Sequence, residues 1–164
     1  MSDTEQAVLE TVNAIGAKLK AKKEMLATAE SCTGGWVGQI ITSVPGTSHW
    51  YDRGFITYSN VAKREMLGVS TDTLTRFGAV SEQTARAMAE GVLQNSQARY
   101  ALSITGIAGP EGGTPEKPVG HVCFAWAGHN RETVSECIRF DGDRQQVRIQ
   151  AVQHSLKRME EFIN

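Results

Sequence analysis

The sequence has no apolar run of the roughly 18 residues that a membrane-spanning helix needs. Its first ten residues, MSDTEQAVLE, are acidic and polar, which does not fit a secretory signal peptide. An excess of basic charge is also missing, because 17 Lys and Arg face 18 Asp and Glu for a net charge of −1. These absences argue against membrane insertion, secretion and a nucleic-acid binder held mainly by phosphate contacts.

Cysteine is scarce, and the three cysteines Cys32, Cys123 and Cys137 lie far apart in the chain. An odd number at such spacing is not typical of a disulfide framework, so we expect reduced thiols and a cytoplasmic protein. The four histidines are scattered, and no CxxC or HxxxH pair occurs. The sequence therefore predicts no metal site.

What is present is the composition of an ordinary soluble domain, with 40% hydrophobic and 21% charged residues. The length of 164 residues fits one domain over residues 1–164. No internal repeat, low-complexity tract or long linker divides the chain. We therefore expect a single hydrophobic core.

Apolar periodicity and capping residues predict an alternation of helices and strands. Asn60 and Ser81 are the expected N-caps of two of the helices. The predicted helices cover residues 3–22, 35–44, 60–69, 71–76, 81–96 and 143–162. The predicted strands cover residues 25–30, 53–59, 100–106, 120–128 and 133–140, the last two joined as a hairpin. This order predicts a three-layer α/β/α domain with a mixed β-sheet.

Polar clusters follow the first three predicted strands. They are Glu30–Thr33, Tyr58–Asn60 and Thr105–Gly106. Ligands of α/β proteins bind beyond the carboxyl ends of the strands, so we expect these clusters to meet in one site.

The first cluster, TAESCTGGW, offers a possible nucleophile directly before a helix. Backbone N–H groups of Thr33, Gly34 and Gly35 would point over the helix N-terminus, where they would bind an oxyanion or a phosphate. The alternative is that Ser31 or Thr33 simply caps the helix. A cysteine thiol is intrinsically a stronger nucleophile than a serine hydroxyl, but a catalytic cysteine usually needs a paired histidine, and these clusters contain none. Cys32 is therefore more typical of a small buried residue.

A possible base for a serine lies at the start of the helix after the second strand. The positive potential of the helix N-terminus would lower the pKa of Lys63, and a neutral lysine can take a proton. A solvated surface lysine is the alternative. Tyr58 would either relay a proton or pack as an aromatic residue of the strand.

The segment ITGIAGPEGG, residues 104–113, is a glycine-rich loop that could bind a phosphate or carboxylate through backbone donors. It does not match the P-loop pattern, because the required lysine is missing. Lys117 and Arg144 would add cationic groups. A plain connecting loop with surface charges is the alternative.

Together these segments resemble the CinA C-terminal domain family, which includes stand-alone nicotinamide-nucleotide amidases. The resemblance spans about residues 5 to 162. The motifs that carry it are TAESCTGG, GFITYSNVAK, GAVSEQTARAMAEG, SITGIAGPEGGTPEKPVG and GDR. Longer CinA proteins carry an additional N-terminal domain that this sequence does not show, so we expect the single-domain form.

The resemblance implies hydrolysis of the carboxamide of nicotinamide mononucleotide to nicotinic acid mononucleotide and ammonia, in pyridine-nucleotide salvage, without metal or cofactor. Carried over by motif, Ser31 is the nucleophile, and Tyr58 and Lys63 are its activating partners. Thr105 would lie near the substrate. Tyr58-Ser59-Asn60 also resembles the Tyr-x-Asn element of serine β-lactamases, although no SxxK motif follows Ser31.

The charged groups of nicotinamide mononucleotide suggest the remaining substrate contacts. Glu30 would face the cationic pyridinium ring, and the loop with Arg144 would hold the phosphate. The predicted binding residues are Glu30, Thr33, Gly34, Gly35, Asn60, Thr105, Gly106, Gly109, Gly112 and Arg144.

A second hypothesis is a non-catalytic nucleotide-binding or interaction module linked to competence or DNA damage, as the family name suggests. The resemblance also suggests a homodimer or higher homo-oligomer. Trp36, Trp50 and Tyr51 are candidate interface aromatics, or alternatively core residues.

Overall fold

The structure, a computed structural model, describes residues 2–163. Its helices are α1 (Asp3–Lys22), α2 (Trp36–Thr42), α3 (Asn60–Leu67), α4 (Thr71–Phe77), α5 (Glu82–Gln94) and α6 (Arg144–Phe162), with a short 3₁₀ turn at Thr47–His49. Its strands are β1 (Leu26–Glu30), β2 (Tyr51–Ile56), β3 (Tyr100–Gly106), β4 (His121–Gly128) and β5 (Val134–Arg139). The predicted elements are thus present, with ends that differ by a few residues.

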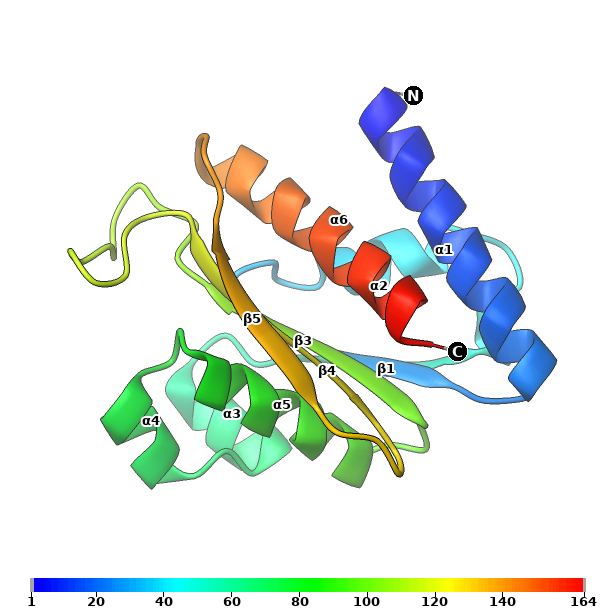
Figure 1. Cartoon of the computed structure of the whole chain (residues 1–164), viewed down its shortest axis with the longest axis horizontal. Coiled ribbons are helices and arrows are strands. Elements are labelled where there is room, and N and C mark those ends of the chain that lie inside the picture. The colour runs from blue at the N-terminus through cyan, green and yellow to red at the C-terminus, as the bar shows by residue number, and fades with distance from the viewer. Residues whose placement is uncertain (1, 164) are drawn as a thin grey trace.

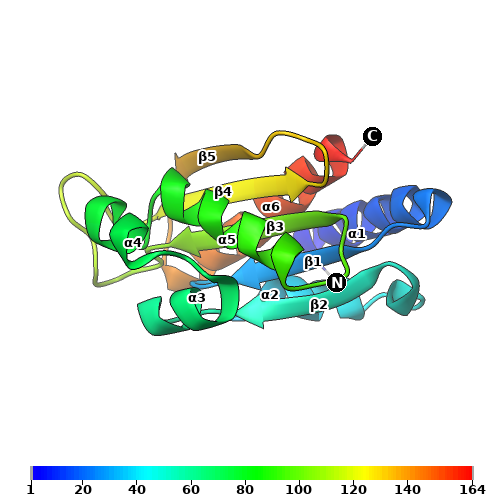
Figure 2. The same cartoon turned by 90° about the horizontal axis from the view of Figure 1, so that it is seen from below.

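The five strands form one sheet in the order β2-β1-β3-β4-β5. Strand β1 runs parallel to β2 and β3, whereas β4 and β5 continue the sheet antiparallel. The carboxyl ends of β1, β2 and β3 therefore lie at the same end of the sheet, beside α3 and the loop that joins β3 to β4 (Figure 2). This edge is where the polar clusters were expected to meet.

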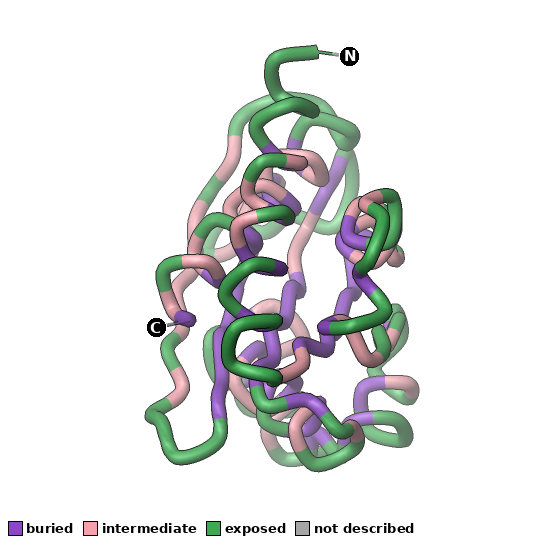
Figure 3. Tube along the Cα trace, turned by 90° about the vertical axis from the view of Figure 1, so that its right-hand side faces the viewer, coloured by how far each residue is buried: buried purple, intermediate pink, exposed green. Residues whose placement is uncertain are grey.

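Helices cover both faces of the sheet, which confirms the predicted three-layer α/β/α fold. Helices α1, α2 and α6 lie on one face, and α3, α4 and α5 lie on the other (Figure 1). Buried residues concentrate on the strands between these layers, and the outer sides of the helices are exposed (Figure 3). No helix within residues 2–163 combines the length and apolar character that a membrane span requires.

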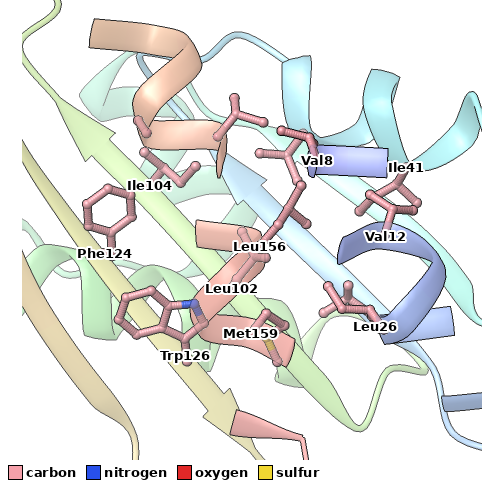
Figure 4. Packing of buried hydrophobic residues seen from close by; sticks show 14 of the residues in the cluster. Val8, Val12, Leu26, Ile41, Leu102, Ile104, Phe124, Trp126, Leu156 and Met159 are labelled. Carbon is pink, nitrogen blue, oxygen red and sulfur yellow. The ribbon is translucent and has the colours of Figure 1, made fainter. Parts of the chain in front are cut away.

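The two faces of the sheet are packed differently. Large side chains fill the α1–α6 side, where Phe124 and Trp126 stack with ring centroids 5.8 Å apart (Figure 4). The α5 side consists mostly of small residues, including Ala85 and Ala89 of α5 itself. Gly91 lets α5 approach α3 closely, since a Cβ there would lie 2.1 Å from the Leu67 carbonyl oxygen. Helix α5 therefore packs closely through its alanine-rich face.

Local details of the prediction need correction. Ser59, not Asn60, caps α3, because its hydroxyl accepts a hydrogen bond from the Ala62 N–H at 3.0 Å. Strand β2 ends at Ile56 instead of continuing to residue 59, since the carbonyls that follow turn away to bind a lysine of α3. Ser81 caps α5 as predicted, with its hydroxyl 3.1 Å from the Thr84 N–H.

The predicted absence of a disulfide is wrong, because Cys123 and Cys137 are joined. They lie directly opposite each other on the antiparallel strands β4 and β5. The number and spacing of the cysteines in the sequence do not show that Cys123 and Cys137 are paired across the two strands. Trp50 also belongs to the core and not to a surface, since it is 2% exposed.

Candidate active site

Ser31 lies at the carboxyl end of β1, at the point where the central strands of the sheet end. Its N–H donates to the Ile104 carbonyl of β3 at 3.0 Å, which holds the residue against that strand. On the other side, the Thr57 N–H donates to the Glu30 carbonyl at 2.8 Å. Hydrogen bonds to both neighbouring strands therefore fix where the Ser31 side chain begins.

The turn that follows Ser31 is organised by the buried carboxylate of Glu30. This carboxylate accepts hydrogen bonds from the Thr33 hydroxyl at 2.6 Å and from the N–H groups of Gly35, Val37 and Gly38 at 3.2, 2.9 and 3.1 Å. It thereby caps α2, whose own N-cap residue is a glycine without a side chain. Glu30 is only 2% exposed. The structure therefore places it beneath the turn, outside the set of residues that line the cavity.

The glycines of the turn serve its backbone geometry. Gly34 and Gly35 have φ angles of 61° and 104°, a left-handed region that favours glycine. Their N–H groups are already used, since Gly34 donates to the Ser31 carbonyl and Gly35 to Glu30. Within residues 2–163, no backbone carbonyl accepts from the N–H of Cys32 or Thr33. In this turn, the N–H groups of Cys32 and Thr33 are therefore free of acceptors from the described backbone, whereas those of the glycines are used.

Lys63 projects from α3 to the Ser31 hydroxyl. Its Nζ lies 3.1 Å from Ser31 Oγ, 2.9 Å from the Thr57 carbonyl oxygen and 3.2 Å from the Tyr58 carbonyl oxygen. The side chain is 1% exposed, and within the described residues no carboxylate pairs with it. Burial without a counter-charge lowers the pKa of Lys63 below its usual 10.5. A neutral amine is thus accessible, within hydrogen-bond reach of a serine hydroxyl.

Cys32 is adjacent to Ser31, but its environment keeps the thiol protonated. Burial raises the pKa of Cys32 to about 12, and the nearby Arg148 guanidinium only partly opposes this effect. The thiolate is the nucleophilic form of cysteine, so little of it exists near neutral pH. Of the two side chains, Ser31 is the one with a base in contact.

Tyr58 contributes to the site mainly through its backbone. Its carbonyl oxygen accepts hydrogen bonds from Lys63 Nζ and, at 3.4 Å, from Ser31 Oγ. Its ring is 64% exposed, and its hydroxyl lies 3.5 Å from Arg144 Nη2. The tyrosine hydroxyl therefore faces the entrance of the site, and its carbonyl faces the serine–lysine pair.

A cavity of about 270 Å³ opens above these residues. The residues that line it are Ser31, Cys32, Tyr58, Asn60, Lys63, Ala79, Val80, Thr105, Gly106, Ile107, Ala108, Gly109, Glu111, Gly112 and Arg144. All three polar clusters therefore contribute to one cavity, as does the glycine-rich loop. Of the expected binding residues, Glu30, Thr33, Gly34 and Gly35 do not line it.

Sequence reasoning missed the wall of the cavity formed by Ala79 and Val80. These residues precede α5, and the Thr105 hydroxyl holds them by donating to the Ala79 carbonyl at 2.8 Å. The signal was available, because both belong to the family motif GAVSEQTARAMAEG. Their side chains are small and apolar, so nothing in their chemistry marked them as binding residues.

The two candidate cations of the glycine-rich loop have different positions. Arg144 lines the cavity, and its Nη1 donates to the Gly109 carbonyl at 2.6 Å, which ties α6 to the loop. Lys117 instead donates to the Phe77 carbonyl at 2.6 Å and does not line the cavity. Arg144 is therefore the cation that a ligand in the cavity would meet.

Arg148 is a further residue that sequence reasoning overlooked. Its guanidinium donates to the carbonyls of Cys32 and Thr33 at 3.0 and 3.2 Å, and it lies 5.2 Å from the centre of the Trp36 ring. It thus holds the turn after Ser31 from the side of α6. No sequence motif marks this position, because the contact joins residues more than a hundred positions apart.

The family model of the CinA C-terminal domain matches residues 9–163. The chain belongs to the CinA C-terminal domain family. A CinA-family relative from Enterobacter agglomerans, named nicotinamide-nucleotide amidohydrolase PncC, is 53% identical over 150 residues, which covers 91% of this chain and 92% of the relative. The protein of that name from Escherichia coli K12 is 48% identical over 154 residues, covering 94% and 93%.

Solved structures agree with this assignment. The crystal structure of a competence/damage inducible protein from Agrobacterium tumefaciens aligns with a TM-score of 0.94 at 43% identity, covering 96% of each chain. The expected CinA family and its α/β fold are therefore confirmed.

Proposed function

We propose that this chain hydrolyses the carboxamide of nicotinamide mononucleotide to nicotinic acid mononucleotide and ammonia, in the salvage of pyridine nucleotides. Relatives about half identical over most of the chain carry the name of this activity. The observation that carries the proposal is the 3.1 Å contact between the Ser31 hydroxyl and the buried Lys63 amine within a small cavity. Amide hydrolysis by a serine needs such a base beside the nucleophile.

In the first half of the reaction, neutral Lys63 takes the proton of the Ser31 hydroxyl as Oγ forms a bond to the carboxamide carbon. The cationic pyridinium ring withdraws electrons from this carbon and makes it more reactive than that of a simple amide. The protonated lysine then delivers its proton to the nitrogen, the C–N bond breaks, and ammonia leaves. The product of this half is an ester between Ser31 and the nicotinic acid mononucleotide.

When Ser31 attacks, negative charge develops on the carboxamide oxygen, and a hydrogen-bond donor is needed to stabilise it. The Cys32 N–H fits this task best, because it directly follows the nucleophile and its residue lines the cavity. Loss of one such donor typically costs roughly 3–4 kcal/mol of transition-state stabilisation. In the second half of the reaction, Lys63 takes a proton from water as the water oxygen bonds to the ester carbon. The bond to Ser31 Oγ then breaks, Lys63 returns the proton to Oγ, and nicotinic acid mononucleotide leaves.

Other residues of the cavity would bind the pyridinium ring and the 5′-phosphate of the substrate. Glu111 is the carboxylate among the residues that line the cavity, so it would face the pyridinium charge in the role first expected of Glu30. Arg144, Gly109 and Gly112 lie together at the glycine-rich loop and would bind the 5′-phosphate. The Tyr58 hydroxyl and Asn60 complete the entrance.

Ammonia release from nicotinamide mononucleotide tests the proposal, with wild type, Ser31→Ala and Cys32→Ala compared in the presence of a chelator. We expect turnover by wild type and by Cys32→Ala, and none by Ser31→Ala. Substrate binding without turnover in wild type would contradict the proposal in favour of a binding module. Loss of turnover in Cys32→Ala alone would identify the thiol as the nucleophile.

We further propose that the chain acts in the cytoplasm as a homodimer or higher homo-oligomer, without nucleic acid as a partner. The near-neutral net charge of −1 supports the last point, since nucleic-acid binding relies on basic patches. Light scattering of the purified protein tests the oligomeric state, and a scattering mass of one chain would contradict it.

A further inference from the structure

Three metal-ligating side chains meet outside the proposed amidase cavity. They are His121 and Cys123 of β4 and Cys137 of β5, and one ligand atom of each lies within 4.8 Å of the others. The Nε2 of His121 is 3.6 Å from the Sγ of Cys123. None of the three lines the cavity that contains Ser31. The cluster therefore has no part in the reaction described above.

The strand geometry explains why these side chains converge. Cys123 pairs with Cys137 in the antiparallel register of β4 and β5. His121 precedes Cys123 by two residues, so both side chains are on the same face of the sheet. Cys123 is fully buried, whereas His121 and Cys137 are partly exposed. An ion would therefore reach the cluster from solvent at His121 and Cys137.

The ligand types of the cluster suit a soft-metal site. Two thiolates and an imidazole are typical ligands of Zn²⁺, with Zn–S near 2.3 Å and Zn–N near 2.0–2.1 Å. In a tetrahedral site these bond lengths separate sulfur from nitrogen by about 3.6 Å. In the disulfide-bonded state the His121 Nε2 already lies 3.6 Å from the Cys123 sulfur, so the imidazole is close enough to join a site once the sulfurs separate. The two sulfurs need a separation of about 3.8 Å, so the disulfide must first open.

We propose that Cys123, Cys137 and His121 form a Zn²⁺ site when the disulfide is reduced. In the reduction, a dithiol supplies two electrons and two protons, the S–S bond breaks, and Cys123 and Cys137 become thiols. Zn²⁺ then displaces the two thiol protons and binds both sulfurs and the His121 imidazole, with solvent in the fourth position. The disulfide and the metal site use the same sulfur atoms, so they exclude each other.

The site is connected to the proposed cavity through the backbone. Cys123 pairs with Thr105 in the β3–β4 register, and the His121 carbonyl accepts from the Ile107 N–H at 2.9 Å. Thr105 and Ile107 both line the cavity. The inference itself does not depend on the amidase activity, and its test needs no substrate.

Binding of Co²⁺ as a spectroscopic stand-in for Zn²⁺ tests the proposal. The reduced and the oxidised protein are each titrated with Co²⁺, after thiol counting has established three free thiols and one free thiol respectively. We expect the reduced form to bind one equivalent with thiolate-to-cobalt absorption, which added Zn²⁺ abolishes. The oxidised form should show no such absorption. Absence of thiolate-to-cobalt absorption in the reduced form overturns the proposal, as does a disulfide that opens only on unfolding.

Variants assign the ligands. Cys137→Ser should lose the thiolate absorption at stoichiometric Co²⁺, and His121→Asn should weaken binding. Cys32→Ala is the matched control, because it removes a buried thiol outside the cluster and should bind as wild type does. Circular dichroism of each variant shows whether it is folded. Binding that survives in folded Cys137→Ser, or is lost in folded Cys32→Ala, overturns the assignment.

Discussion

The Nζ of Lys63 lies 3.1 Å from the Oγ of Ser31, although 32 residues separate them in the chain. The contact follows from topology, because β1 and β2 are parallel neighbours and end at the same edge of the sheet. Ser31 follows the first strand directly, and α3 carries Lys63 back over the end of the second. Burying an amine without a carboxylate partner costs stability. We interpret this cost as the source of a neutral lysine.

Replacement of Lys63 by methionine should abolish the activity while the fold is retained. Methionine fills a similar volume but cannot accept a proton, so we expect kcat to fall by roughly 100- to 10,000-fold. The unfolding temperature should fall only modestly, because the cost of burying the amine disappears while the Thr57 and Tyr58 carbonyls lose their donor. Ammonia release and thermal denaturation of the same preparation provide the two measurements.

Lys63→Arg is the informative companion to this variant. Arginine keeps the positive charge and can donate to the same carbonyls, but it does not become neutral in proteins. It should therefore be as inactive as Lys63→Met. Substantial activity of a folded Lys63→Arg protein would show that the side chain only positions Ser31.

The activity should rise with pH because the neutral form of Lys63 is the active one. Burial lowers the pKa of this lysine from 10.5, so the rise should have its midpoint below that value. The sign for stability follows from proton binding. At pH values between the lowered pKa of Lys63 in the folded protein and 10.5, Lys63 is protonated in the unfolded chain but mostly neutral in the folded protein. The free energy of unfolding contributed by Lys63 therefore increases with pH in this window.

A pH series of kcat/KM, with denaturant unfolding of wild type and Lys63→Met at each pH, measures both effects. The stability of wild type relative to Lys63→Met should increase as the pH is raised. A relative stability that falls with rising pH would mean that Lys63 is charged in the working enzyme.

Much of the site was predictable because its residue types and positions carry local signals. Ser31 and Tyr58 follow parallel strands, which place such residues at one edge, whereas the roles of Ser31, Tyr58 and Lys63 were taken from the family resemblance. The carboxylate of Glu30 was assigned to the substrate because of the pyridinium charge, and nothing in the sequence indicates that this side chain caps α2. The disulfide was missed for a similar reason. It depends on the register of Cys123 against Cys137, which a count of cysteines does not contain.

Removal of the Glu30 carboxylate should destabilise the protein more than removal of any single partner. Glu30→Ala leaves three buried or half-buried N–H groups and the Thr33 hydroxyl without their acceptor, so we expect a loss of about 3 kcal/mol in the free energy of unfolding. Thr33→Val, which removes one of the four hydrogen bonds, should cost only about 1 kcal/mol. Denaturant unfolding compares the two. A stable Glu30→Ala protein with a raised KM would instead place the carboxylate against the substrate.

The role of Arg144 can be separated into ligand binding and loop support by using two substrates. If Arg144 binds the 5′-phosphate, Arg144→Ala should raise KM for nicotinamide mononucleotide by about tenfold or more and lower kcat much less. Nicotinamide riboside has no phosphate, so its weaker hydrolysis should be almost unaffected by the same substitution. Arg144 also holds the Gly109 carbonyl and approaches the Tyr58 hydroxyl, so a merely structural role would reduce the hydrolysis of both substrates equally. Kinetics of wild type and Arg144→Ala on the two substrates distinguish these outcomes, and equal losses would exclude Arg144 as the phosphate contact.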